Sequence, residues 1–255
     1  MDWMDPMEPV LRETVIKGED WVHQIKWDGI RGLCYVEQHQ NRLFTRSGRE
    51  RIAWYPEIAG INHMLNCKEA VLDGELIVLN EEGRPSFYHV MARERVKRQE
   101  RLAQYREKYP VQYMVFDILY RDGVDLRGSA LQERKIILEK TLKGDGMIQV
   151  VSDYSDGEAL FCAMKEKGME GIVSKHLSSR YIGGKKHREW FKTKVKKRLL
   201  CVVCGVKLKE GEIKSLVLGI CQNGGLIPVG NVSSGFSYKD KTLLMQALDQ
   251  LQQKE

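Results

Sequence analysis

Ionisable residues interrupt apolar, strand-like segments of this chain, and this pattern limits the folds that it can adopt. The segment Ala70-Val-Leu-Asp-Gly-Glu-Leu-Ile-Val-Leu79 is dense in branched residues typical of a strand, yet it contains Asp73 and Glu75. Gln112-Tyr-Met-Val-Phe-Asp-Ile-Leu-Tyr120 is a second such strand, with an aspartate at its centre. A purely structural sheet disfavours carboxylates in these positions, because burying an unpaired charge is costly. The pattern therefore predicts sheets that carry a polar site.

The organisation of the chain follows from its hydrophobic periodicity. Short strands separated by turns dominate the first two-thirds, with alternation predicting strands at 21–26, 32–36, 42–45, 171–174 and 190–194. Two helices are predicted, at Leu131–Leu142 and Asp156–Lys167, each followed by a glycine. The charged segment Arg93–Lys108 holds acidic residues at helical spacings, so we expect a solvent-exposed helix with its own salt bridges.

The pattern changes near Lys196-Lys-Arg198. Three strand-like segments with hairpin turns follow, at 199–208, 215–221 and 226–232, and a helix is predicted at Tyr238–Leu251. We therefore predict a first domain of residues 1–197 and an all-β second domain of residues 198–255.

Composition narrows the class of protein. Hydrophobic residues make up 42% and charged residues 30% of the 255 positions, which is typical of a globular protein. The sequence has no apolar run of the ~20 residues that a membrane span needs and no secretory signal pattern, so we expect a cytoplasmic protein without a membrane partner. The net charge of +6 favours a polyanionic partner without identifying it.

The strongest chemical signal is Lys26-Trp-Asp-Gly-Ile-Arg31. A lysine at a strand end, followed by an Asp-Gly turn and an arginine, can present an amine beside a phosphate-binding cation. Alternation places Lys192 and Lys194 on one face of a later strand, so both ammonium groups can meet one phosphate. Each polar cluster alone could be a charged turn, but the ordered set favours chemistry. The five clusters after the first are Thr45-Arg46-Ser-Gly48, Asp73-Gly-Glu75, Phe116-Asp117, Glu170-Gly-Ile-Val-Ser-Lys175 and Trp190-Phe-Lys192-Thr-Lys194.

In order and content, these six clusters resemble the motifs of the covalent nucleotidyltransferase superfamily of ATP-dependent DNA ligases, RNA ligases and mRNA capping enzymes. The first is similar to its motif KxDGxR, and the resemblance covers about residues 9–197. Trp21, Thr45-Arg46-Ser-Gly48 and the segment Gly183-Gly-Lys-Lys-His-Arg-Glu-Trp190 are most similar to small bacterial ligases and the ligase domain of the end-joining ligase D. The resemblance implies an α+β fold. An antiparallel-sheet nucleotidyltransferase domain, of the ATP-grasp-like DNA ligase adenylation type, would precede a short OB-fold-like domain.

The resemblance also implies an activity, that of an ATP-dependent DNA ligase sealing 5′-phosphate/3′-hydroxyl nicks in duplex DNA. Lys26 would form a lysyl-AMP intermediate, and AMP would then pass to the DNA end. A lysine attacks only as the neutral amine, and its ordinary pKa is about 10.4, so the site must favour that form. The implied partners are nicked duplex DNA and repair or end-joining proteins, with the chain acting as a monomer of bacterial or phage origin.

Further roles are implied for residues around the nucleotide. Phe116 would stack on adenine and Gln24 would help to read it, while Arg46 would contact the 5′-phosphate of the nick. The remaining implied roles are the ribose for Arg31 and Glu75, the nucleotide phosphates for Lys192 and Lys194, and Mg²⁺, replaceable by Mn²⁺, for Glu170 with Asp73 or Glu75.

Two departures from the family pattern keep alternatives open. Many relatives carry glutamate where this chain has Gln24, which leaves the base preference open. No basic closing motif occurs before Glu255, so the second domain is expected to be shortened or the chain truncated, with slow self-adenylylation. The alternatives are an RNA ligase or RNA-capping guanylyltransferase, and a non-catalytic nucleic-acid-binding relative.

Overall fold

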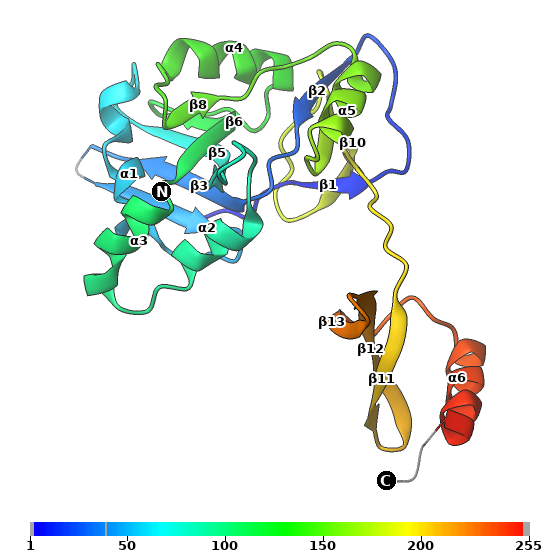
Figure 1. Cartoon of the computed structure of the whole chain (residues 1–255). Helices are drawn as coiled ribbons and strands as arrows, with labels where there is room; N and C mark the ends of the chain where they lie inside the picture. Colours follow the sequence, from blue (N-terminus) through cyan, green and yellow to red (C-terminus); the bar gives the residue numbers. More distant parts are fainter. Residues whose placement is uncertain (1–2, 39, 252–255) are drawn as a thin grey trace. The chain divides into compact units, whose positions relative to one another are not determined.

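The structure, a computed structural model, describes residues 3–38 and 40–251. The chain divides into two compact units, Met1–Val195 and Lys196–Glu255 (Figure 1). The predicted α+β class with antiparallel sheets is confirmed. Among the described residues, no helix is both long and apolar enough to cross a membrane.

Two sheets form the framework of the first unit (Figure 1). The larger sheet has antiparallel neighbours in the order β4 (Asn41–Thr45), β3 (Ile30–Val36), β5 (Ala70–Ile77), β6 (Gln112–Arg121) and β7 (Val124–Asp125), with β8 (Ile148–Val150) parallel to β6. The smaller sheet has the order β1 (Glu8–Leu11), β10 (Lys186–Lys194), β9 (Gly171–His176) and β2 (Trp21–Ile25), with only the β1–β10 pair parallel.

Alternation along the strands gives the larger sheet two apolar faces. On β3, Cys34 and Val36 belong to a core cluster with residues of the helices, whereas Leu33 and Tyr35 belong to a second cluster. That second cluster includes Trp190 of β10, so it joins the two sheets. The helices of this unit are α1 (Pro56–Ala59), α2 (Phe87–Glu94), α3 (Leu102–Lys108), α4 (Leu131–Thr141) and α5 (Gly157–Glu166), with 3₁₀ turns at Ile52–Trp54, Ile61–Met64 and Gln99–Arg101.

A bulge interrupts the pairing of β5 with β6. Asp73 pairs with Asp117 but Gly74 pairs with Val115, so Phe116 is an extra residue on β6. Bulges bend a strand and re-aim its side chains, and they are common beside active sites. Here the bulge lies at the aromatic residue that we predicted to stack on a base.

The predicted helices at 131–142 and 156–167 are confirmed as α4 and α5, and Asp156 caps α5 by accepting a hydrogen bond from the Ala159 N–H at 2.9 Å. The prediction of one exposed helix at Arg93–Lys108 is wrong. α2 ends at Glu94 and α3 begins at Leu102. Arg93 is fully buried and pairs with Glu57 of α1 at 3.1 Å, so tertiary ion pairs replace the expected pairs within one helix.

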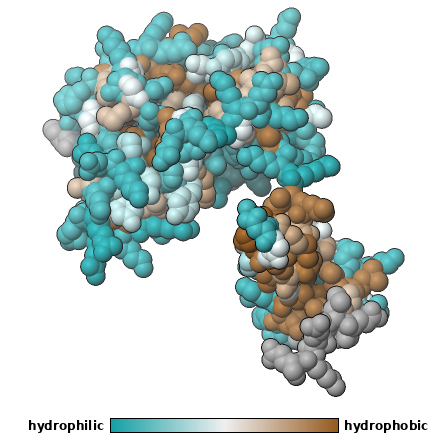
Figure 2. All heavy atoms as spheres, in the orientation of Figure 1, coloured by the Kyte–Doolittle hydropathy of each residue, from teal (hydrophilic) through white to brown (hydrophobic). Residues whose placement is uncertain are grey.

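The second unit is a three-stranded antiparallel sheet followed by one helix. Its elements are β11 (Val202–Lys209), β12 (Glu212–Gln222), β13 (Gly225–Val232) and α6 (Tyr238–Leu251). Asn223 and Gly224 have φ values of 52° and 77°, as the predicted tight hairpin turn requires. Figure 2 shows apolar side chains gathered over these strands. Leu208 of β11 and Val229 of β13 are about half exposed.

Candidate active site

A cavity of about 650 Å³ is lined by strands of both sheets of the first unit and by α2. Apolar and cationic side chains share its wall, which suits a ligand with a flat ring and negative charge. Most of the residues that the sequence singled out lie on this wall, namely Gln24, Lys26, Arg31, Arg46, Glu75, Phe116 and Lys192.

Lys26 directly follows β2 and forms one end of a three-residue ion cluster. Its Nζ donates to Glu170 Oε2 at 2.7 Å, and Lys194 Nζ lies 2.7 Å from Glu170 Oε1. Burial alone would raise the pKa of Glu170, but hydrogen bonds and charges from Lys194 and Lys26 outweigh it and lower the pKa. One ionised carboxylate therefore holds two amines at the edge of the cavity.

Glycines bring the backbone close enough to form this cluster. The Lys26 N–H donates to the Gly171 carbonyl at 3.0 Å, which ties the end of β2 to the start of β9. Gly171 has a φ of 140°, and a side chain there would overlap the Thr193 carbonyl of β10. A side chain at Gly29 would likewise overlap the Leu76 carbonyl of β5. Glycine at these positions lets the strands approach.

Lys192 adds a third cation to this part of the wall. Burial lowers the pKa of Lys192, and the positive charges of Lys26 and Lys194 lower it further. Three lysines at one end of a cavity repel each other, and an anionic ligand would relieve that repulsion.

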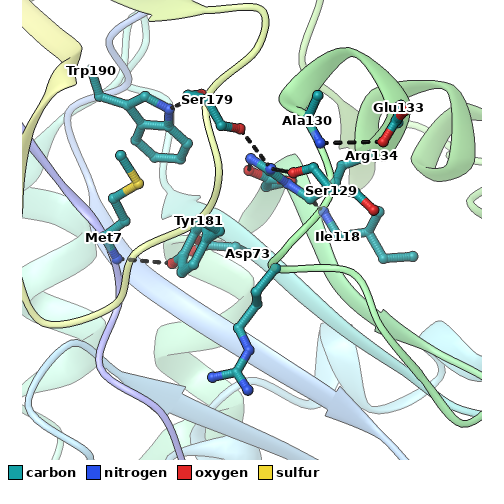
Figure 3. Close-up of polar contacts among 12 residues, drawn as sticks. Met7, Asp73, Ile118, Ser129, Ala130, Glu133, Arg134, Ser179, Tyr181 and Trp190 are labelled. Atoms are coloured by element: carbon teal, nitrogen blue, oxygen red, sulfur yellow. Dashed lines mark hydrogen bonds and ion pairs between the residues drawn. The ribbon is translucent and has the colours of Figure 1, made fainter.

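Asp73 holds Arg31 in place. Its carboxylate accepts from Arg31 Nε at 2.5 Å and Nη2 at 2.6 Å, and from the Tyr181 hydroxyl at 2.6 Å. Tyr181 in turn accepts from the Met7 N–H at 3.0 Å (Figure 3). Asp73 is completely buried, so its contacts favour a positioning role for this carboxylate.

The predicted metal ligands are therefore divided between two places. Asp73 lies with Arg31, and Glu170 lies with Lys26 and Lys194. Within residues 3–38 and 40–251, no group of three or more His, Cys, Asp or Glu side chains could hold a metal ion. Glu75 lines the cavity, and burial raises its pKa to about 7. A divalent cation here would bind mainly to Glu170 and to ligand phosphates, the oxygen-rich coordination that Mg²⁺ prefers.

Two cations lie against the aromatic wall of the cavity. Arg31 Cζ lies 4.6 Å from the Phe116 ring centroid, and Lys175 Nζ lies 4.1 Å from the ring centroids of both Phe116 and Trp190. Lys175 is 2% exposed, and its Nζ has no hydrogen-bond partner among the described residues. Burial lowers the pKa of Lys175 to about 7. Lys175 ends the sequence cluster Glu170-Gly-Ile-Val-Ser-Lys175, in which a role was predicted only for Glu170.

Arg46 lies at the cavity wall with most of its side chain in solvent. Its Nη1 is 3.4 Å from Glu8 Oε1, and its side chain is 68% exposed. An exposed guanidinium beside a cavity can contact a ligand phosphate that stays outside the cavity.

Comparisons with known proteins identify the family of this chain. The family described as ATP dependent DNA ligase domain matches residues 5–194. The chain belongs to this family. A multifunctional non-homologous end joining DNA repair protein LigD from Mycobacterium tuberculosis is 32% identical over 237 residues, which is 91% of this chain and 30% of that protein. The chain thus spans about a third of the length of such curated relatives.

Solved structures of ligase domains share the fold of this chain. Mycobacterial DNA ligase D complexed with ATP and MES aligns with 30% identity and a TM-score of 0.66, covering 99% of this chain and 79% of that one. The ligase domain of LigD from M. tuberculosis aligns with 30% identity and a TM-score of 0.63, covering 99% and 80%. The resemblance stated from the six motifs is therefore confirmed at the level of family and fold.

Proposed function

We propose that this chain is an ATP-dependent ligase that seals nicks in duplex DNA and that Lys26 is its nucleophile. The observation that supports this most strongly is the ion cluster of Lys26, Glu170 and Lys194 at the edge of a cavity with an aromatic wall, in a chain of the ligase family. The amine and the cationic groups that an attack on a phosphate requires lie together there.

In the first step, Lys26 Nζ attacks the α-phosphorus of ATP. The N–P bond forms, the bond from phosphorus to the pyrophosphate oxygen breaks, and pyrophosphate leaves. A protonated amine has no lone pair, so Lys26 must leave its ion pair with Glu170 and lose a proton before it attacks. Lys192 and Lys194 remain to balance the charge of the phosphates.

In the second and third steps, AMP passes to the DNA. A 5′-phosphate oxygen of the nick attacks the phosphorus of lysyl-AMP, and the bond to Lys26 breaks. The neighbouring 3′-hydroxyl then attacks the 5′-phosphorus, forming the phosphodiester bond and releasing AMP. Arg46 lies at the cavity wall and is largely exposed, which suits a contact with the 5′-phosphate of a nick.

Other side chains would hold the nucleoside. Phe116 would offer its ring to adenine, and Arg31 with Glu75 would bind the ribose hydroxyls. Mg²⁺, replaceable by Mn²⁺, would neutralise the nucleotide phosphates, with Glu170 as its main protein ligand. Asp73 would act through Arg31 instead of as a metal ligand.

The substrate and partners follow from charge and from the relatives. The basic segment between Lys185 and Arg198 and the second unit would bind duplex DNA, so we expect binding to weaken steeply with salt. Relatives described as end-joining proteins support a role in repairing broken DNA beside other end-joining proteins. We further propose that the chain acts as a monomer in the cytoplasm.

Sealing assays on synthetic nicks test this proposal. Wild type, Lys26→Ala and Lys17→Ala would be compared on a nicked DNA duplex, on a nick in an RNA strand and on single-stranded RNA, with ATP or GTP. Lys17 forms an exposed pair with Glu158 at 3.3 Å and serves as the matched control. We expect wild type and Lys17→Ala to seal nicked DNA with ATP, and Lys26→Ala to be at least about 10³-fold slower.

Sealing, covalent labelling and duplex binding, measured on the same substrates and nucleotides, separate the alternatives. Sealing confined to RNA would identify an RNA ligase, and covalent labelling by GTP alone would identify a guanylyltransferase. Duplex binding without labelling by either nucleotide would indicate a non-catalytic relative.

A further inference from the structure

A network of charged groups fixes the amide of Gln24. The side chain is 2% exposed and lies on the cavity wall. Its Nε2 donates to Asp153 Oδ1 at 2.8 Å. The second carboxylate oxygen, Asp153 Oδ2, lies 2.6 Å from Lys135 Nζ of α4. The network thus runs from α4 through Asp153 to the amide of Gln24.

Asp153 decides which end of the amide faces its carboxylate. An ionised carboxylate only accepts hydrogen bonds, and the carboxylate of Asp153 forms an ion pair with Lys135. Gln24 must therefore turn its NH₂ group toward Asp153. Within the part of the chain that the structure describes, its Oε1 atom accepts no hydrogen bond from the protein. The atom that remains for a ligand is a carbonyl oxygen, the same kind of acceptor that a glutamate would present.

The position of this oxygen suits a base. Gln24 and Lys26 are two residues apart, at the end of β2, and both line the cavity, so they are separated by about 7 Å along the strand direction. Adenine carries an exocyclic NH₂ donor at C6, whereas guanine and hypoxanthine carry an acceptor oxygen there. An acceptor oxygen on the cavity wall accepts a hydrogen bond from the NH₂ group of adenine and repels the C6 oxygen of guanine or hypoxanthine.

We propose that Asp153 is a positioning residue for nucleotide selection. It holds Gln24 with Oε1 facing the cavity, so that the amide selects a 6-amino purine over a 6-oxo purine. This inference rests on the proposed function, because it assumes that the cavity binds the nucleotide that Lys26 attacks. A carboxylate at position 24 would lie beside Asp153 and be repelled by it, whereas the amide of Gln24 can donate to it.

Competition between ATP and ITP tests this inference. ITP differs from ATP only in carrying oxygen at C6 in place of the amine, with a proton on N1. Self-nucleotidylation would be measured with each nucleotide for wild type and Asp153→Asn, and the ratio of the two kcat/KM values compared. An asparagine can accept or donate, so Gln24 is free to turn its NH₂ toward the O6 of ITP. We expect the ATP/ITP ratio to fall about tenfold, with slower use of ATP and faster use of ITP.

Two further variants separate positioning from simple damage. Gln24→Glu combined with Asp153→Asn presents a carboxylate oxygen in either orientation, so we expect it to restore the preference for ATP. Asp125→Asn removes a carboxylate from an exposed pair with Arg127 outside the cavity, and we expect it to leave the ratio unchanged. A loss of folding in Asp153→Asn would slow both nucleotides together and would not change their ratio.

The outcomes are distinguishable. A lower ratio in Asp153→Asn together with rescue by the double variant would support the inference. Labelling of Asp153→Asn with an unchanged ratio would overturn the inference and leave the proposed function intact. Wild type that is labelled by neither nucleotide would overturn both.

Discussion

The first unit contains two kinds of carboxylate–cation contact that differ in burial. Asp117 and Arg134 are both fully buried, with nitrogen–oxygen distances of 2.8 and 2.9 Å. Glu170 holds Lys26 and Lys194 at 2.7 Å, but these side chains are 19%, 21% and 46% exposed. Both contacts join a carboxylate to cationic side chains, so we attribute the difference in their roles to the difference in burial.

The ion pair of Asp117 and Arg134 is enclosed by the core on all sides. Arg134 also donates to the carbonyls of Ser129 and Ser179, so its guanidinium is satisfied on several sides (Figure 3). Removing one partner would strand a charge in the core. The cluster at Glu170 borders the cavity, where water and ligands can replace each contact. We infer that burial separates the ion pairs that hold the fold from those that take part in chemistry.

The largest effect that this comparison predicts is on stability. Asp117→Ala leaves Arg134 buried and unpaired, so we expect it to lower the free energy of unfolding by about 3–5 kcal/mol. Asp125→Ala removes one partner of an exposed pair with Arg127, and we expect a loss of less than about 1 kcal/mol. Urea unfolding of both variants measures the difference, and equal losses would contradict the distinction between the two kinds of pair.

The second prediction concerns two titrating groups on the cavity wall. Burial raises the pKa of Glu75 from 4.5 to about 7, so the folded protein holds a proton that the unfolded chain loses, and stability falls as pH rises through this range. Burial lowers the pKa of Lys175 from 10.5 to about 7, so here the unfolded chain holds the extra proton, and stability rises between pH 7 and 10.5. Together the two groups place a stability minimum near pH 7.

Thermal unfolding across pH, with nucleotide-free protein, checks this minimum. We expect Glu75→Gln to flatten the acidic limb and Lys175→Met to flatten the alkaline limb, each by roughly 3–5 kcal/mol. Limbs that stay unchanged in both variants would show that other groups set the pH dependence.

The third prediction separates activity from stability at the exposed cluster. Glu170→Gln removes the charge that holds Lys26 and Lys194, and we expect nick sealing to slow by about 10²-fold, or about 2.7 kcal/mol. The free energy of unfolding should change by less than about 1 kcal/mol, because both lysines are partly exposed and water can replace the lost contact. Glu158→Gln, which alters an exposed pair with Lys17, is the control. A large loss of stability in Glu170→Gln would contradict this prediction and would show that the cluster stabilises the fold as the buried pair does.

Local sequence signals predicted much of the fold. Strong alternation located the strands that carry the motifs, and glycine stops located the ends of α4 and α5. The prediction of one helix at 93–108 was wrong because its charged side chains form ion pairs with distant residues instead of with each other along a helix. Arg93 forms an ion pair with Glu57, and Glu94 forms one with Arg51, with a nitrogen–oxygen distance of 2.9 Å. Contacts between distant segments do not show up as a periodic pattern in the sequence of either segment.

The candidate site shows the same limit. The motifs predicted which side chains gather at the cavity, since a strand fixes the face on which each residue lies. They did not predict that Asp73 would be committed to Arg31 and Tyr181. Nor did they point to Asp153, which lies outside every motif and reaches Gln24 only through the fold.

The most direct test of the central claim is the intact mass of the protein, freed of bound nucleotide, after incubation with ATP and Mg²⁺. Wild type and Lys26→Arg would be compared under neutral conditions that preserve a phosphoramidate, before and after adding nicked DNA. The account predicts that wild type gains the mass of one AMP, that nicked DNA removes it, and that Lys26→Arg gains nothing. An AMP adduct that persists in Lys26→Arg, or that maps to another lysine, would contradict the account.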